Sequence, residues 1–307
     1  MDINSVGRTS ASTPPIIAGF LSAIVAAALF GSVSTVAKPI LSNISPILLS
    51  TLVYLVAGLT FTPIAYRTPA RKTPAKYYAL VVISGIVGAA LAPVMFFIGL
   101  QQTTATDSSL LVNGETVFSI LFALLLFKEK IKPPVYVAIF LILAGVFIVT
   151  TNFRLGESIF DLNSGDVLII AATMIWGLDN NVNKIITRHI NVSKLVQLKS
   201  LIGGGISLLV VFILGIPLVI QPDQIIPILI VGVFGFAISL FLYLHAIKRI
   251  GVVKASSLLS LSAVFGLTFA ALFLGEPVSI YQIVAVAVMF IGVYIMYRYE
   301  VKMEVLK

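Results

Sequence analysis

Polar side chains gather on one predicted helix face inside a long apolar segment of this sequence. Four of them follow the i, i+3, i+4, i+7 spacing that places residues on one side of a helix: Trp176, Asp179, Asn180 and Asn183. A charge at the centre of a bilayer costs at least about 2.5 kcal/mol, so a carboxylate found there usually faces a cavity or a partner. We therefore expect this stripe to line a solute pathway. The alternative is a hydrogen-bonded seam between helices.

A second carboxylate, Glu115, lies within the apolar segment 107–127, close to Asn113. It can line the same cavity and exchange a proton or bind an amine, or it can be a paired or protonated carboxylate with a structural role. An internal alignment, given below, pairs Glu115 with Ser262, whose hydroxyl is a further candidate. Our predicted pathway residues are Glu115, Asn113, Trp176, Asp179, Asn180, Asn183 and Ser262, with Glu115 and Asp179 as the candidates for ion coupling.

The composition indicates that lipid surrounds most of the chain that positions these groups. Of its 307 residues, 59% are apolar and 10% are charged, whereas soluble domains carry about 25% charged residues. This excludes a soluble enzyme, a nucleic-acid-binding domain and a disordered chain. A helix needs about 20 apolar residues to cross a bilayer. Ten segments qualify: 15–37, 44–66, 77–100, 107–127, 134–151, 166–187, 195–219, 225–247, 253–274 and 278–297.

The basic residues predict the orientation of these spans in the cell membrane. Of the 20 Lys and Arg residues, all but Lys38 and Arg154 fall on the side of the predicted helices that holds both termini; this count includes Lys199. Basic loops stay in the cytoplasm. We therefore expect a multi-pass protein with both termini cytoplasmic, and the excess of positive charge no longer favours a nucleic-acid partner.

The chain contains an internal repeat. Shifting the sequence by 147 residues aligns 85–150 with 232–297 without a gap, and 16 of the 66 pairs are identical. A shift of 146 aligns the first span with the sixth, where Phe30, Val33, Ser34 and Ala37 match the polar stripe. Each half holds five spans, an odd number, so the second copy enters the membrane inverted. Inverted repeats are common in secondary transporters, which bind their substrate where the repeats meet.

These residues resemble the EamA-type members of the drug/metabolite transporter superfamily. The resemblance rests on an aromatic-Gly pair followed by Lys at the end of each first helix, and on repeated Glu and Gly positions: Phe30-Gly31 with Lys38, Trp176-Gly177 with Lys184, Glu129 and Glu276, Gly145 and Gly292. It implies ten helices around a central cavity that opens alternately to each side and moves small metabolites, often amino acids outward. Many members have a Pro midway along the fourth helix of each repeat, where this chain has Thr116 and Ala263.

The predicted fold is therefore an all-α integral membrane protein with ten transmembrane helices in two inverted five-helix repeats around a central cavity. We expect a cytoplasmic tail at 1–14, repeats at 15–151 and 166–297, an extracytoplasmic linker at 152–165 and a cytoplasmic tail at 298–307.

The predicted function is a secondary transporter that moves a small metabolite, and an amino-acid exporter is one form of it. The alternative is a channel or facilitator, which would need selective groups along a continuous pore. With no Cys, two His and no phosphate-binding loop, we expect no metal, no cofactor and no enzymatic activity. The expected partners are a small-molecule substrate and the lipid bilayer. The sequence leaves the oligomeric state, the substrate, the transport direction and the coupling ion open.

Overall fold

The computed structural model describes residues 15–69, 72–151 and 163–299, and these residues form helices and no strand. The first half contains α1 (Pro15–Ile40), α2 (Pro46–Arg67), α3 (Ala75–Ile86), η1 (Val87–Leu91), α4 (Ala92–Gln102), α5 (Ala105–Leu111), α6 (Gly114–Leu125) and α7 (Pro133–Thr151). The second half contains α8 (Ser164–Ile186), α9 (Val192–Ile213), α10 (Pro222–Ile230), η2 (Val231–Ile238), α11 (Ser239–Ile250), α12 (Val252–Leu259), α13 (Ser262–Leu274) and α14 (Ile280–Tyr297). The predicted tail 1–14, Arg154 and most of the predicted linker and C-terminal tail lie outside the described residues.

These helices form ten spans, as the sequence predicts. Eight of them are long and apolar enough to cross a membrane: α1, α2, α3 to α4, α5 to α6, α9, α10 to α11, α12 to α13, and α14. The fifth, α7, is apolar over its shorter part Pro133–Gly145. The sixth, α8, has 23 residues but carries the polar stripe in its C-terminal half. Large apolar side chains such as Leu59, Phe140, Phe212 and Phe290 are exposed on the outside of the bundle, the surface that lipid covers.

Four of the ten spans are interrupted, at related places in the two repeats. The third and eighth spans each pass through a π-helical segment, η1 and η2, which contain Gly88 and Gly235. The fourth and ninth spans each break in the middle, before Gly114 and before Ser262. Short i to i−3 bonds replace the helical pattern there, from the Glu115 N–H to the Val112 carbonyl and from the Ala263 N–H to the Ser260 carbonyl. The fourth and ninth spans, which are equivalent in the two repeats, thus break although Thr116 and Ala263 stand where a proline would be expected.

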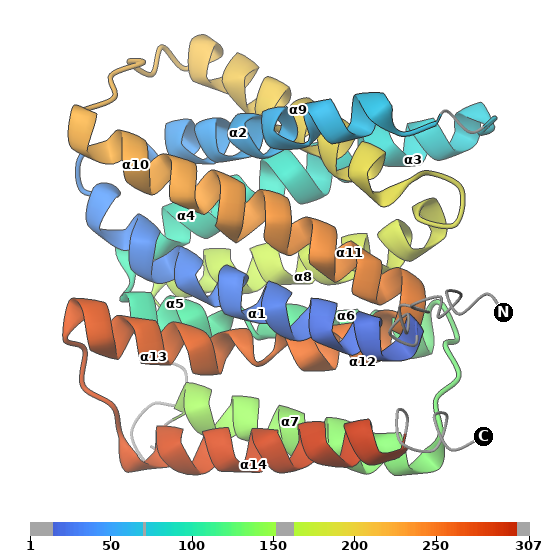
Figure 1. Cartoon of the computed structure of the whole chain (residues 1–307). Coiled ribbons are helices and arrows are strands. Elements are labelled where there is room, and N and C mark those ends of the chain that lie inside the picture. Colours follow the sequence, from blue (N-terminus) through green and yellow to red (C-terminus); the bar gives the residue numbers. More distant parts are fainter. Residues whose placement is uncertain (1–14, 70–71, 152–162, 300–307) are drawn as a thin grey trace, which may run out of the picture.

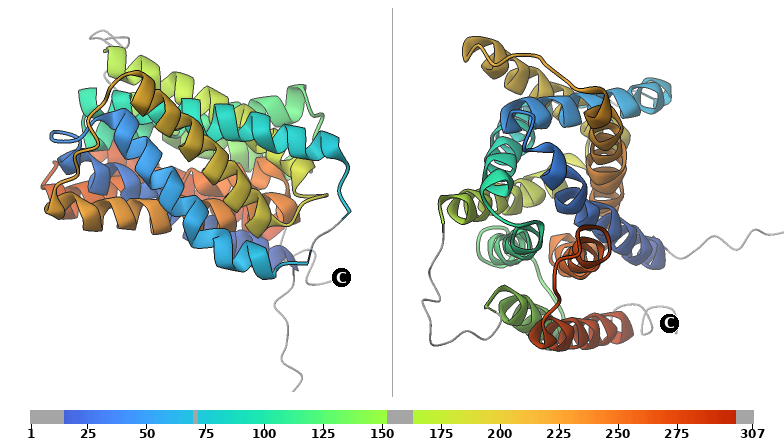
Figure 2. Two further views of the ribbon diagram at one scale, coloured as in Figure 1. Left: turned by 90° about the horizontal axis from the view of Figure 1, so that it is seen from above. Right: turned by 90° about the vertical axis from the view of Figure 1, so that its left-hand side faces the viewer.

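The two halves pack as inverted copies. Figure 1 shows α1 and α8, the first helices of the two repeats, running in opposite directions. Contacts between the halves are reciprocal, since α1 packs on α11 and α13 while α8 packs on α4 and α6. The remaining equivalent helices meet each other, α2 with α9 at one edge of the bundle and α7 with α14 at the other (Figures 1 and 2). The centre of the molecule therefore lies between α1, α8 and the interrupted spans.

Most of the described basic residues belong to one end of the bundle, where α1 begins and α14 ends (Figure 1); we call it the basic end, and Lys38 in the last turn of α1 lies at the other end. The connections from α2 to α3, α6 to α7, α8 to α9 and α11 to α12 all lie at the basic end. The prediction that Lys199 belongs to this group of basic residues is wrong. Lys199 lies inside α9 with 2% of its surface exposed, because its amine pairs with a buried carboxylate.

Candidate functional site

A cavity of about 50 Å³ lies where the two repeats meet. We call it the central cavity. Helices of both repeats line it, with aromatic side chains forming much of the wall and a few charged or amide groups set among them: Phe30, Tyr54, Glu115, Trp176, Asp179, Asn180, Lys199, Phe236 and Tyr243.

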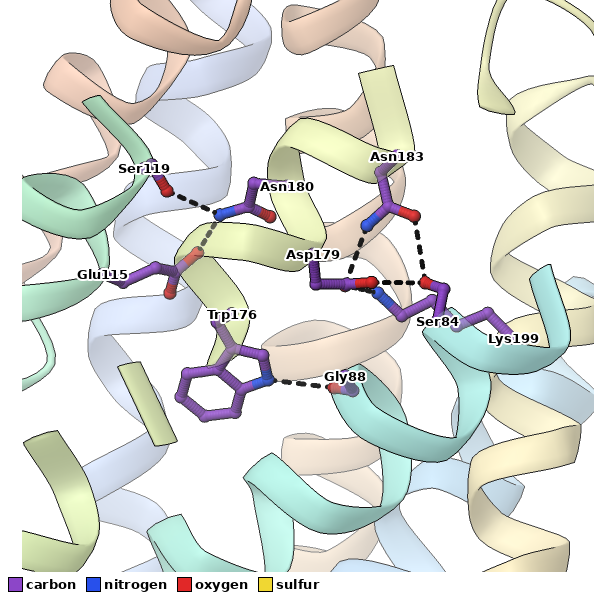
Figure 3. Close-up of polar contacts among 9 residues, drawn as sticks. All are labelled: Ser84, Gly88, Glu115, Ser119, Trp176, Asp179, Asn180, Asn183 and Lys199. Atoms are coloured by element: carbon purple, nitrogen blue, oxygen red, sulfur yellow. Dashed lines mark hydrogen bonds and ion pairs between the residues drawn. The ribbon is translucent and has the colours of Figure 1, made fainter. Parts of the chain in front are cut away.

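Trp176 is fixed in the wall of the central cavity by both its ring and its N–H group. Its indole Nε1–H donates to the carbonyl oxygen of Gly88 over 2.9 Å (Figure 3). Its ring meets Phe30 edge to face, with centroids 6.0 Å apart. Gly88 lies in the π-helical segment η1, and a Cβ there would come within 2.6 Å of the Asp179 carboxyl carbon. Only a glycine lets the η1 backbone approach both Trp176 and Asp179 this closely.

Asp179 lies in the wall of the central cavity and is held there by a network of polar contacts. Its carboxylate forms an ion pair with Lys199 of α9 and accepts hydrogen bonds from Ser84 of α3 and from Asn183 (2.9 Å) (Figure 3). The Ser84 hydroxyl also lies 3.1 Å from Asn183 Oδ1. Asp179 and Lys199 are 3% and 2% exposed. A buried charge pair is stable only when its geometry is good and its remaining bonds are made, and this network meets both conditions.

Glu115 lies on the other side of the same stripe and has a different environment. It is 6% exposed, and its Oε1 accepts a hydrogen bond of 2.7 Å from Asn180 Nδ2, which also lies 3.0 Å from the Ser119 hydroxyl (Figure 3). Among the described residues, no Lys, Arg or His forms an ion pair with it. Glu115 is therefore the carboxylate of the central cavity that is left to receive a cation or a proton.

A smaller cavity of about 10 Å³ is the repeat-related counterpart of this region; we call it the mate cavity. The repeat alignment matches Phe30, Val33, Ser34, Phe96 and Ser262, which line it, with Trp176, Asp179, Asn180, Tyr243 and Glu115 of the central cavity. Asp179, Asn180 and Glu115 of the central cavity thus correspond to Val33, Ser34 and Ser262 of the mate cavity, which are apolar or carry a hydroxyl group.

The structure brings four of the seven predicted pathway residues to the central cavity: Glu115, Trp176, Asp179 and Asn180. Asn183 lies behind the wall, where it bonds Asp179 and Ser84. Asn113 lies at the break between α5 and α6, where its amide approaches the Ser109 carbonyl at 3.5 Å and its Oδ1 has no partner. Ser262 lines the mate cavity.

Sequence reasoning missed three polar groups of the site: Ser84, Lys199 and Tyr54. Lys199 lies two turns into α9, within the predicted apolar span 195–219, and that position distinguishes it from a loop lysine. Ser84 and Tyr54 could not be predicted as site residues from the sequence, because hydroxyl groups are common in membrane helices. In the described part of the chain, no group of three or more His, Asp or Glu side chains gathers to hold a metal ion.

Comparison with known proteins gives the same architecture. The model of the EamA-like transporter family matches twice, over residues 17–151 and 163–298. An uncharacterized transporter of Methanothermobacter thermautotrophicus is 30% identical over 91% of this chain and 86% of its own length. One of Clostridium kluyveri is 25% identical over 92% and 94%. A WAT1-related protein of Arabidopsis thaliana is 30% identical over 41% of this chain and 38% of its own.

One solved crystal structure superimposes with a TM-score of 0.71 over 94% of this chain and 98% of its own, at 17% identity, and this likeness shows the fold alone. The family match covers both halves of the chain, in agreement with the two inverted repeats described above. The family is one of membrane transporters, and the apolar spans agree with a multi-pass membrane protein. The chain belongs to the EamA-like transporter family.

Proposed function

We propose that this protein is a secondary transporter of the cell membrane that moves a small metabolite by alternating access. The observation that carries the proposal is the cavity at the meeting of two inverted repeats, where carboxylate and amide groups lie among aromatic side chains, because transporters of this architecture bind their substrates there. The two repeats, proposed as residues 15–151 and 166–297, would rock against each other around the bound solute. The basic end would face the cytoplasm, as the excess of Lys and Arg in its connections favours.

The groups of the central cavity favour a solute that carries a basic nitrogen. Glu115 has an anionic group without a cationic partner, and Asn180 orients its carboxylate. Tyr54, Phe236 and Tyr243 line the same cavity, and aromatic faces attract cations within about 6 Å. Asp179 would take no direct part, since Lys199 already neutralises it. An amino acid with its ammonium group at Glu115 is one solute of this kind.

A proton is the other ligand that Glu115 can exchange. A carboxylate in a membrane interior that binds either a proton or a cation can couple the two fluxes in opposite directions. Replacing Glu115 by Gln removes the group that would exchange the proton, so the Glu115→Gln protein should lose the response to a pH gradient, and the uptake that remains should be weaker than that of the wild type.

Solute uptake into proteoliposomes tests the proposal. A mixture of small amines, amino acids and their neutral and acidic analogues is supplied, and the internal content is measured by mass spectrometry. We expect saturable uptake of one or more amine-bearing solutes. Uptake that rises linearly with concentration, together with single-channel currents, would identify a channel instead, and the absence of any solute flux from correctly folded protein would remove the proposal.

A further inference from the structure

Two lysines and two glutamates occupy repeat-related positions at opposite ends of the bundle. Lys184 lies in the last turn of α8 and Lys38 in the last turn of α1. Glu129 and Glu276 follow α6 and α13, and their N–H groups bond the equivalent carbonyls of Ala123 and Ala270. The polar stripe and the central cavity contain none of these four residues.

At the basic end, the lysine and the glutamate form a direct ion pair. Lys184 Nζ lies 2.7 Å from Glu129 Oε2, and the two side chains are 25% and 10% exposed. The other Glu129 oxygen packs against Gly251, whose φ of +85° begins α12, and a Cβ at that position would collide with it. This contact therefore joins α8 and α12 of the second repeat to the connection after α6 of the first repeat.

At the opposite end, the repeat-related lysine and glutamate contact other groups instead of each other. Lys38 Nζ donates to the carbonyl oxygens that end α4, those of Leu100 (2.9 Å), Gln101 (3.1 Å) and Thr103. Glu276 accepts from the backbone N–H of Thr106 (3.0 Å) and from its hydroxyl, at the start of α5. Within the described chain no ion pair joins Lys38 to Glu276, so the two ends of a symmetric framework hold asymmetric contacts.

We propose that the pairs Lys184–Glu129 and Lys38–Glu276 are two alternating gates, of which only the one at the basic end is closed in this structure. The inference rests on the proposed function, because it explains how the rocking repeats close each end in turn. In a protein of inverted repeats, each repeat adopts in one state the contacts that its copy makes in the other. In the alternative state Lys38 pairs directly with Glu276, and Lys184 turns to the carbonyl oxygens of Ile247, Lys248 and Ile250, which the alignment matches to the three partners of Lys38.

Cysteine labelling tests these gates without requiring a known solute. The chain has no cysteine, so a Leu240→Cys variant places a single reporter in the central cavity. A membrane-impermeant maleimide is added to either face of reconstituted protein. We expect Glu129→Gln to raise the labelling rate from the basic end about two- to fivefold, the range that loss of a partly exposed ion pair gives. Glu276→Gln is the matched control, and it should raise labelling from the opposite face.

The charge-swapped variant Lys184→Glu with Glu129→Lys should restore the original labelling. The proposal is overturned if both single variants change labelling from the same face, if neither changes it in protein that remains monodisperse, or if the folded charge swap does not restore it. Labelling that shifts as expected in a protein without solute flux would sustain the gates and remove the proposed function. Saturable solute flux with unchanged labelling would sustain the proposed function and remove the gates.

Discussion

The central cavity and the mate cavity are built from the same framework but differ in chemistry. Trp176, Asp179 and Asn180 on α8 correspond to Phe30, Val33 and Ser34 on α1. Across from them, Glu115 of the first repeat corresponds to Ser262 of the second. The central cavity has a volume of about 50 Å³ and the mate cavity about 10 Å³. The repeat symmetry thus supplies the framework, while the carboxylate, amide and indole groups are concentrated in the central cavity.

A second contrast lies within the central cavity itself. Asp179 has a cation, a hydroxyl and an amide as partners, whereas the Glu115 carboxylate accepts a hydrogen bond from the amide of Asn180 and forms no ion pair among the described residues. Two carboxylates on facing helices therefore have different roles: Asp179 ties α3, α8 and α9 together, and Glu115 remains available to a ligand. The following predictions test this division, beginning with the largest expected effect.

Removing the cation from the Asp179 network should be the most damaging change. Lys199→Met leaves Asp179 buried without a counter-charge, which costs about 3–5 kcal/mol of folding free energy. Thermal unfolding of the purified protein measures it, and the double variant Lys199→Met with Asp179→Asn should recover much of the loss. A Lys199→Met protein as stable as the wild type would show that the ion pair does not hold the helices.

The repeat-related glycines of the π-helical segments should respond differently to substitution. A Cβ at Gly88 meets three atoms of the Asp179 carboxylate within 3.0 Å, whereas one at Gly235 meets a methyl of Val33 at 2.6 Å and nothing else closer than 3.8 Å. Gly88→Ala should therefore cost about 1–3 kcal/mol of stability. Gly235→Ala should cost less, because the Val33 side chain can move. Equal losses in the unfolding temperature would contradict the asymmetry of the two cavities.

The Trp176 hydrogen bond should have the smallest effect. Trp176→Phe keeps an aromatic ring but removes the donor to the Gly88 carbonyl, a loss of about 1 kcal/mol. We expect at most about a fivefold weaker apparent affinity for the transported solute. Phe30→Leu, at the equivalent place on α1, is the matched control and should change the affinity less. A larger loss of affinity in the Phe30→Leu protein would indicate that the solute binds nearer to the mate cavity.

The spans and their inverted repetition could be predicted from the sequence because apolar length and identities at fixed spacing report them directly. The α8 stripe could be placed by helix periodicity, and it does face the interior. The partners of that stripe could not be predicted. Lys199 is only 20 residues from Asp179 in sequence, but their pairing depends on how α8 and α9 pack after the turn between them.

The breaks in the fourth and ninth spans also could not be predicted from the sequence. Neither break contains a proline, and ordinary residues such as Asn113 and Ser260 carry the change of hydrogen-bonding pattern. Whether Asn113, Asn183 and Ser262 contact a solute stays a prediction, since the structure places them away from the wall of the central cavity.

The most direct test of the account compares Glu115→Gln with Ser262→Ala, the equivalent position of the mate cavity, in proteoliposomes that take up the identified solute. Loss of a contact between a charged group and its ligand costs about 1.5–3 kcal/mol. We expect Glu115→Gln to lower the ratio of maximal rate to half-saturating concentration by at least about tenfold, with Ser262→Ala within about twofold of the wild type. Equal losses in the two variants, or an unaffected Glu115→Gln protein, would contradict the assignment of Glu115 as the group that binds the solute.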